Sequence, residues 1–99
     1  MCGIVGIIGE QRGEESILAK TMLEKIKHRG PDHQQCHSFK YATLGSARLS
    51  VVDKNSESNQ PFISKSKNTV VVFNGEIFNY KELSTKFDLY LKTKSDTEV

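Results

Sequence analysis

The sequence predicts an α+β domain, because segments patterned as strands alternate with segments patterned as helices. Residues 4–8 are a continuous, largely β-branched apolar run, which favours a buried strand. Residues 14–29 place apolar side chains at helical spacing, with acidic residues first and basic residues last, the charge order that a helix dipole favours. Residues 69–73, TVVVF, have the strongest strand pattern in the chain. The 99 residues correspond to about one domain or less.

The elements between these segments follow from shorter signals. Gly30 and Pro31 end the first helix, and residues 34–53 then indicate two or three short strands, of which RLSVVD (48–53) has the clearest pattern. Residues 54–68 are rich in Ser, Asn and Lys and indicate a polar loop. The sequence contains no internal repeat and no interdomain linker.

Two capping signals lie in the last third of the chain. Residues 79–87 indicate a helix in which Asn79 and Glu82 have N-cap and N3 spacing, and a short strand is expected over 88–93. The final SDTEV (95–99) repeats the capping spacing and indicates the start of another helix. Because a helix needs several turns to offset its nucleation, we expect a chain truncated at a helix start.

The composition excludes several classes of protein. The net charge is +2, and Lys and Arg are dispersed among acidic residues, so no nucleic-acid or polyphosphate surface is expected. No apolar run approaches the ~18–20 residues of a membrane span, and residues 4–8 lack the basic flank of a secretory signal. We therefore expect a cytoplasmic protein without a membrane segment, in which Cys2 and Cys36 are thiols.

Cys2 has two interpretations. Removal of Met1 would place a thiol and a free α-amine on one residue, and the reference pKa of an α-amine, ~7.7–8.0, makes it usable as a base near neutral pH. This is the nucleophile and base pair of N-terminal-nucleophile enzymes. The alternative is a small buried apolar residue at the start of a strand. Cys2 by itself leaves both interpretations open.

The cluster of His28, His33, Cys36 and His37 raises the alternative of a zinc site. Adjacent residues of a strand point to opposite faces, so Cys36 and His37 do not readily reach one ion, and the C-x₂-C pair of zinc knuckles is missing. We therefore favour an interpretation of this cluster as cations at a helix end together with a buried Cys36, and we expect no metal in this segment.

Three further residues follow the strand pattern of 69–73. Asn74-Gly75 is a common turn dipeptide, but a turn alone leaves Glu76 and a side-chain amide at a strand end unexplained. The amide of Asn74 and the N–H of Gly75 would instead suit a developing oxyanion.

Arg48 and Asp96 are single charges, and each is compatible with an ordinary surface ion pair. Across one pocket they would match a free amino acid, with the guanidinium on its α-carboxylate and the carboxylate on its α-ammonium.

Six motifs occur in order along residues 1–99. They are MCGI (1–4), HRGPD (28–32), ARLSVVD (47–53), QP (60–61), NGEIFNY (74–80) and SDTEV (95–99). Together they resemble class II glutamine amidotransferases, most of all the N-terminal glutaminase domain of glutamine-hydrolysing asparagine synthetases. Each motif is weak alone, but the ordered set is specific.

This resemblance implies the four-layered αββα sandwich of N-terminal-nucleophile hydrolases, with residues 1–99 as its N-terminal portion. It implies glutamine as the substrate and ammonia as the product passed to an absent synthetase domain, which would make asparagine from aspartate. ATP and Mg²⁺ are expected only in that domain, with no cofactor in this segment. A homodimer of the complete protein is also expected.

The resemblance implies catalytic roles for three residues. Cys2 would be the nucleophile, with its own α-amine as the general base. Asn74 and Gly75 would contact the substrate and form the oxyanion hole. The product of the first step would be a γ-glutamyl thioester, which water then hydrolyses to glutamate.

The implied substrate contacts are Arg48 with the α-carboxylate, and Glu76 with Asp96 at the α-ammonium. One departure concerns the residue two positions before the arginine, which is histidine in many family members and Ser46 here. The tuning of the site is therefore expected to differ, while the implied substrate clamp is retained.

A second hypothesis is a truncated, non-catalytic fragment that retains the motifs and acts at most as an interaction partner. A further alternative is an amidotransferase that supplies a different acceptor, although HRGPD favours a synthetase relative over phosphoribosyl and sugar amidotransferases. A reading frame that continues past Val99 would favour the enzyme over the fragment.

Overall fold

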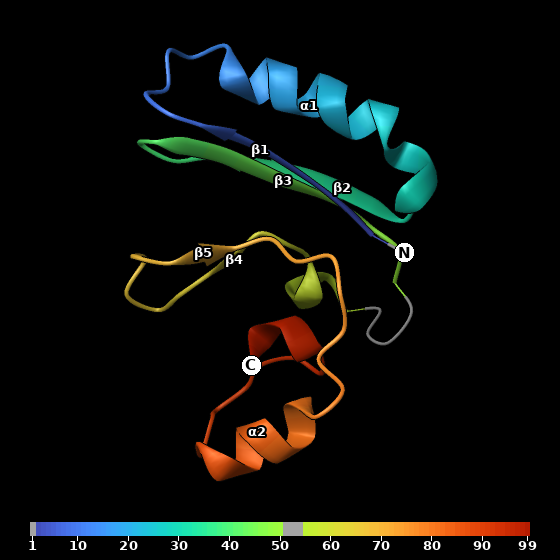
Figure 1. The fold of residues 1–99 in the computed structure, drawn as a ribbon, viewed down its shortest axis with the longest axis vertical. Coiled ribbons are helices and arrows are strands. Elements are labelled where there is room, and N and C mark those ends of the chain that lie inside the picture. The colour runs from blue at the N-terminus through green and yellow to red at the C-terminus, as the bar shows by residue number, and fades with distance from the viewer. Residues whose placement is uncertain (1, 51–54) are drawn as a thin grey trace.

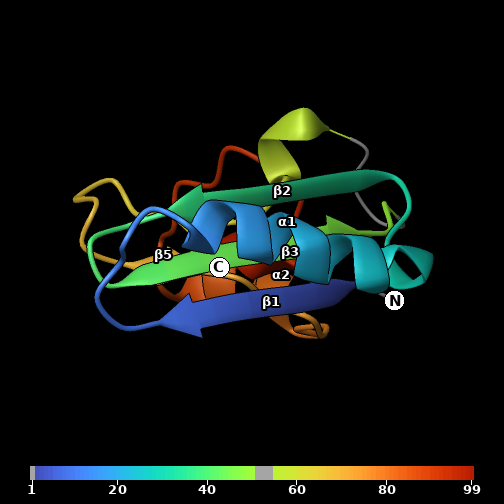
Figure 2. The same cartoon turned by 90° about the horizontal axis from the view of Figure 1, so that it is seen from above.

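The computed structural model describes residues 2–50 and 55–99, and the first of these ranges forms a sheet covered by one helix. Three strands pair antiparallel in the order β1–β3–β2: β1 (Gly3–Ile8), β2 (His33–Ser38) and β3 (Ala42–Arg48). Helix α1 (Glu15–Lys25) lies across one face of this sheet (Figure 1). Seen from above, β3 runs between β1 and β2 beneath the helix (Figure 2).

The core lies between α1 and the sheet. Its buried hydrophobic residues are Val5, Ala19, Leu23 and Ala47, with Ile7, Met22, Ile26 and Cys36 packed around them. Gly3 pairs with Ala47 in the register of β1 on β3, so the start of β1 lies beside the end of β3. This register brings the residue before β1 close to the residue after β3.

The predicted strand over 4–8 forms, but only one of its faces is buried. Val5 packs in the core, whereas Ile4 and Ile8 are 46% and 77% exposed. Successive side chains of a strand alternate between faces, so Ile4 and Ile8 lie on the face away from α1. A run that is apolar at every position does not reveal which face a helix will cover.

The helix predicted over 14–29 is shorter than expected. Its α-helical part ends at Lys25, and a 3₁₀ turn, Lys27–Arg29, completes the segment. Gly30 then passes so close to β3 that a Cβ atom there would lie 2.1 Å from the carbonyl oxygen of Ala47. Only glycine permits this approach, which brings the HRGPD motif against the end of β3.

The second described range lies on the other side of the sheet from α1 (Figure 1). Its elements are the hairpin of β4 (Phe62–Ile63) and β5 (Val70–Val71), helix α2 (Tyr80–Lys86), and 3₁₀ turns at Ser56–Ser58 and Asp96–Glu98. The hairpin lies between the sheet and the end of the molecule that carries α2.

One strand prediction in this range is wrong in extent, and another is wrong altogether. The strand expected over 69–73 contains only Val70–Val71, because the backbone N–H and C=O of Phe73 pair with the side chain of Gln60 instead of a neighbouring strand. Residues 88–93, where a strand was expected, contain no strand and run irregularly from a turn at Asp88 to bends at Lys92 and Thr93.

Among the described residues of RLSVVD, 48–50, only Arg48 lies in a strand. Strand β3 ends at Arg48, and residues 51–53 of the motif lie outside the described residues.

The two predicted caps have different outcomes. Asn79 occupies the N-cap of α2, but among the described contacts its side chain makes no capping hydrogen bond. Ser95 does cap, because its Oγ accepts a hydrogen bond from the N–H of Thr97 at 3.3 Å. The helix start expected at SDTEV is therefore present as the 3₁₀ turn Asp96–Glu98.

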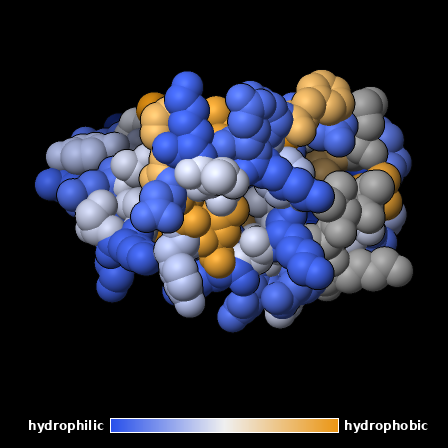
Figure 3. All heavy atoms as spheres, turned by 90° about the horizontal axis from the view of Figure 1, so that it is seen from below, coloured by the Kyte–Doolittle hydropathy of each residue, from blue (hydrophilic) through white to orange (hydrophobic). Residues whose placement is uncertain are grey.

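An open groove of about 930 Å³ lies beside the hairpin, with Phe62, Val71, Leu89 and Tyr90 in its lining. Tyr90 is 82% exposed. The view from below shows hydrophobic residues exposed between polar ones at the α2 end of the molecule (Figure 3).

In the described part of the chain, no helix is long and apolar enough to cross a membrane.

Candidate active site

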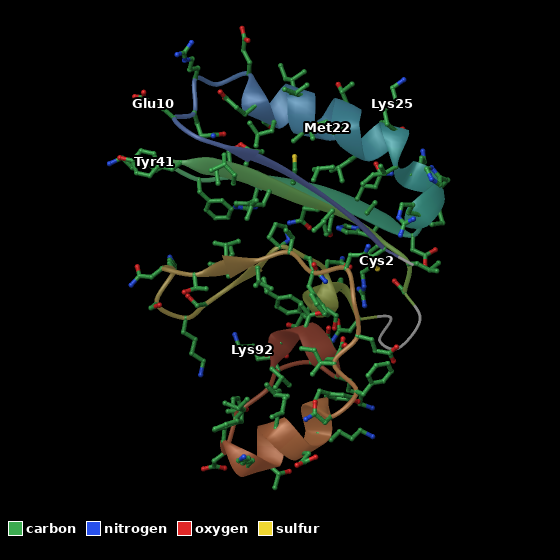
Figure 4. The ribbon with its side chains drawn as sticks, viewed as in Figure 1. Cys2, Glu10, Met22, Lys25, Tyr41 and Lys92 are labelled. Atoms are coloured by element: carbon green, nitrogen blue, oxygen red, sulfur yellow. The ribbon has the colours of Figure 1, made fainter. Side chains whose placement is uncertain are left out.

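Cys2 lies at the end of the sheet where β1 begins and β3 ends, opposite the end marked by Glu10 and Tyr41 (Figure 4). The backbone N–H of Leu49 donates to its Sγ at 3.4 Å, and Sγ lies 3.8 Å from the Leu49 carbonyl oxygen. The Cys2 side chain is partly exposed. The strand register thus places an accessible thiol directly beside the residue that follows Arg48.

The HRGPD motif holds both strand ends in place. Arg29 Nε donates to the carbonyl oxygen of Cys2 at 3.2 Å. The N–H of Asp32 donates to the carbonyl oxygen of Arg48 at 3.1 Å, and its Oδ2 accepts from the N–H of Ser50 at 2.7 Å. The motif therefore fixes the backbone of Cys2 and the backbone on both sides of Leu49.

Arg48 is 9% exposed, so its guanidinium has left bulk water. Nη1 donates to Asn59 Oδ1 at 2.6 Å and to the carbonyl oxygen of Asn55 at 3.0 Å. Because the guanidinium is planar and rigid, two acceptors on one nitrogen set the orientation of the whole group. Asn55 and Asn59 therefore orient the predicted carboxylate-binding residue.

Asn74, Gly75 and Glu76 are exposed, and they directly follow Phe73, whose backbone is fixed by Gln60. A Cβ atom on Gly75 would lie 2.5 Å from the Phe73 ring. A side chain at position 75 would therefore have to displace the Phe73 ring.

Asp96 is tied to the same segment, although it lies about twenty residues further along the chain. Its Oδ2 accepts a hydrogen bond from the N–H of Ile77, the residue after Glu76, at 2.7 Å. The structure therefore brings the two predicted ammonium-binding carboxylates onto contacting segments.

The six predicted site residues thus form two sets. In the first set, Cys2 accepts a hydrogen bond from the N–H of Leu49, the residue after Arg48. In the second set, Asp96 accepts a hydrogen bond from the N–H of Ile77, the residue after 74–76. The pair Asn59–Gln60 connects the sets, since Asn59 binds Arg48 and Gln60 binds Phe73. Sequence patterns mark Gln60 only as part of QP and do not mark Asn59, because both sit in a segment whose polarity indicates an ordinary loop.

Comparison with known proteins decides the family. The sequence model of the glutamine amidotransferase domain matches residues 1–99. The chain belongs to the glutamine amidotransferase domain family. The resemblance drawn from the six motifs is therefore confirmed.

The chain is similar to proteins from a bacterium, an archaeon and a plant. It is 39% identical over 104 residues to asparagine synthetase [glutamine-hydrolyzing] 2 of Bacillus subtilis (strain 168). It is 36% identical over 119 residues to a putative asparagine synthetase [glutamine-hydrolyzing] 2 of Methanocaldococcus jannaschii, and 35% over 104 residues to the asparagine synthetase [glutamine-hydrolyzing] of Zea mays. The whole chain aligns each time, but it spans only 14%, 23% and 17% of these relatives, respectively.

Cys36 and His37, the adjacent members of the considered zinc cluster, lie in different surroundings in the structure. Cys36 faces α1, with its Sγ 3.9 Å from the carbonyl oxygen of Ser16, whereas His37 is exposed beside the ring of Phe39. Within residues 2–50 and 55–99, no three His, Cys, Asp or Glu side chains are grouped to hold a metal ion. Cys2 and Cys36 are free thiols, as predicted.

Glu98 holds the segment before the 3₁₀ turn Asp96–Glu98. Its carboxylate accepts hydrogen bonds from the N–H of Lys92 at 2.8 Å, and from the N–H and Oγ1 of Thr93, both at 2.7 Å. Burial acts to raise the pKa of Glu98, but these hydrogen bonds outweigh burial and hold the pKa below its usual 4.5.

We expect the hydrogen bonds to the Glu98 carboxylate to stabilise the fold less in acid than at neutral pH. Because folding lowers the pKa of Glu98, its charged form stabilises the fold above the unfolded pKa, and this contribution is lost as the pH falls through the folded pKa. The measurement is the melting temperature of the wild type and of Glu98→Gln from neutral pH down to about pH 3. The wild type should melt higher at neutral pH, with the difference shrinking in acid. A difference independent of pH would contradict this prediction.

Proposed function

We propose that the protein hydrolyses glutamine to glutamate and ammonia with Cys2 as the nucleophile. The observation that carries this proposal is the hydrogen bond from the N–H of Leu49 to Cys2 Sγ, at 3.4 Å. It sets the thiol of Cys2, a partly exposed residue, against the backbone of the residue after Arg48, whose buried guanidinium is oriented by Asn55 and Asn59. A nucleophile beside a carboxylate-binding group is what an enzyme acting on the side chain of a free amino acid requires.

The chemistry proceeds by acyl transfer. Once Met1 is removed, the α-amine of Cys2 accepts the thiol proton, and the sulfur attacks the side-chain amide carbon of glutamine. The Asn74 amide and the Gly75 N–H donate to the resulting oxyanion. The α-ammonium returns its proton to the leaving nitrogen, ammonia departs, and a γ-glutamyl thioester remains. Water, deprotonated by the α-amine, then attacks the thioester, releasing glutamate and restoring the thiol.

Arg48 is proposed to bind the α-carboxylate of glutamine, while Glu76 and Asp96 bind the α-ammonium. The orientation of Arg48 by Asn59, and the hydrogen bond from Ile77 to Asp96, support these assignments. They hold groups of the required charge on fixed segments before substrate arrives.

The larger context is also part of the proposal. We infer that α1 and the three-stranded sheet are two layers of a four-layered αββα sandwich, and that β4–β5 belongs to the third. Because the similar proteins are named glutamine-hydrolysing asparagine synthetases, the ammonia is proposed to serve asparagine synthesis from aspartate in a separate, ATP- and Mg²⁺-dependent domain. A cytoplasmic homodimer of the complete protein is proposed with it.

The direct test is a glutaminase assay on the full-length protein. Equal amounts of glutamate and ammonia should appear from glutamine, and the rate should saturate with glutamine concentration. 4-Aminobutanamide, which has the same side-chain amide but no α-carboxylate, should be a much poorer substrate. Absence of glutamate formation, with the purified protein folded, would contradict the proposed function.

Replacing Arg48 with alanine should mainly raise the KM for glutamine. Loss of a charged hydrogen bond to the unreacting end of the substrate is worth about 1.5–3 kcal/mol and does not alter the chemical step. The variant should therefore retain most of its kcat, and its slow hydrolysis of 4-aminobutanamide should be unchanged. Arg12→Ala, at an exposed position, is the matched control. An unchanged KM would remove Arg48 from the site.

A further inference from the structure

We propose that Gln60 is a positioning residue for the oxyanion hole, an inference that rests on the proposed function. Gln60 is 8% exposed, and both ends of its side-chain amide are used on one residue. Nε2 donates to the carbonyl oxygen of Phe73 at 3.1 Å, and Oε1 accepts from the N–H of Phe73. This two-point contact takes the place of strand pairing immediately before Asn74 and Gly75.

The oxyanion segment is consequently held at both ends. Gln60 fixes it at Phe73, and Asp96 fixes it at Ile77 through the hydrogen bond of 2.7 Å. Nε2 of Gln60 also lies 3.4 Å from Oγ1 of Thr97, the neighbour of Asp96. One side chain therefore contacts both the segment proposed to stabilise the oxyanion and the turn proposed to bind the α-ammonium.

Gln60 is itself fixed to the sheet. The hydroxyl of Ser46, which is 2% exposed on β3, donates to the carbonyl oxygen of Gln60 at 3.2 Å. Ser46 lies two residues before Arg48, and Asn59 beside Gln60 accepts from Arg48. The position of the oxyanion segment is thus set relative to the strand that carries the proposed carboxylate clamp.

The position of this segment matters for rate because oxyanion donors act only over a short range. They must lie about 2.7–3.1 Å from the oxygen as it becomes charged. A misplacement of about 1 Å can cost on the order of 100-fold in rate. Since the oxyanion exists only after attack, displacing Phe73 should lower kcat far more than it raises KM.

The test replaces Gln60 with methionine in the full-length protein. Methionine has a similar length and shape but cannot make the two hydrogen bonds to Phe73. We expect kcat for glutamine to fall about 10- to 100-fold, with KM changed much less. Gln35→Met, at an exposed position on β2, is the control and should retain the wild-type kcat.

A second readout separates positioning from general damage. Alkylation of Cys2 by iodoacetamide is a substitution at a saturated carbon, so no oxyanion forms. Its rate should be the same in Gln60→Met and in the wild type. A fall in alkylation equal to the fall in kcat would indicate a damaged fold or thiol and would overturn the inference, as would a wild-type kcat.

If Gln60→Met does not fold, Ser46→Ala decides. It removes only the hydroxyl that holds the Gln60 carbonyl, and kcat should fall by a smaller factor, about 3- to 10-fold, with alkylation unchanged. An unchanged kcat in a folded Ser46→Ala protein would overturn the inference. An inactive wild type would overturn the proposed function and this inference together, which distinguishes that failure from a failure of the inference alone.

Discussion

Replacing Cys2 with serine is expected to abolish glutamine hydrolysis, lowering kcat on the order of 10⁴-fold or more. Serine keeps roughly the size of the side chain, but its hydroxyl is a much weaker acid than a thiol, so in a site formed around a thiol the α-amine should generate far less nucleophile from it. The measurement is ammonia release at saturating glutamine. Binding of glutamine should persist, because Arg48, Glu76 and Asp96 are unchanged.

Cys36→Ser is the matched control for that variant. Cys36 packs toward α1, with its Sγ near the carbonyl oxygen of Ser16, so its loss should affect stability slightly and leave kcat unchanged. A second variant carries an uncleavable extension before Cys2 and should be as inactive as Cys2→Ser, because it removes the free α-amine. Retained hydrolysis with a blocked N-terminus would contradict the proposed role of that amine.

The second large effect is expected for Asn74→Ala, with a fall in kcat of roughly 10²–10³-fold. The amide is proposed to donate to the oxyanion, which is present in the transition state but not in bound glutamine, so KM should change much less. Asn74 is exposed and its truncation leaves the core intact, so the effect is expected on chemistry instead of folding. Steady-state kinetics with glutamine provide both constants.

Asn68→Ala, at an exposed position in the β4–β5 hairpin, is the control for Asn74→Ala and should behave as the wild type. Equal kcat values for the wild type and Asn74→Ala would show that the Asn-Gly dipeptide serves only as a turn. That result would restore the simpler interpretation of this segment.

Local patterns predicted the elements that depend on local interactions. The apolar run of β1, the charge order of α1 and the capping spacing at Ser95 each correspond to an element in the structure. The errors occur where tertiary contacts override the local pattern. The strand pattern around Phe73 is interrupted because Gln60, thirteen residues earlier, takes both of its backbone groups.

The sequence motifs nominate a set of candidate site residues, which stays a prediction, but they do not predict how those residues are arranged. The motifs named Cys2 and Arg48, yet their approach depends on the register in which Gly3 pairs with Ala47. A strand register is set by packing over a whole sheet, and no single residue encodes it. The contacts of Asn59 and Gln60 were not predictable. An Asn or Gln in a polar segment looks the same in the sequence whether its side chain is exposed in a loop or buried against another segment.

The role of Cys2 as the nucleophile is tested most directly by the mass of the full-length protein before and after reaction with a glutamine analogue that carries an electrophile in place of the side-chain amide. We expect that Met1 is absent, that one adduct forms, that peptide mapping places it on Cys2, and that excess glutamine slows the labelling. Retention of Met1, labelling of Cys36 or another residue instead, or labelling that glutamine does not slow would contradict the assignment of Cys2 as the glutamine-directed nucleophile.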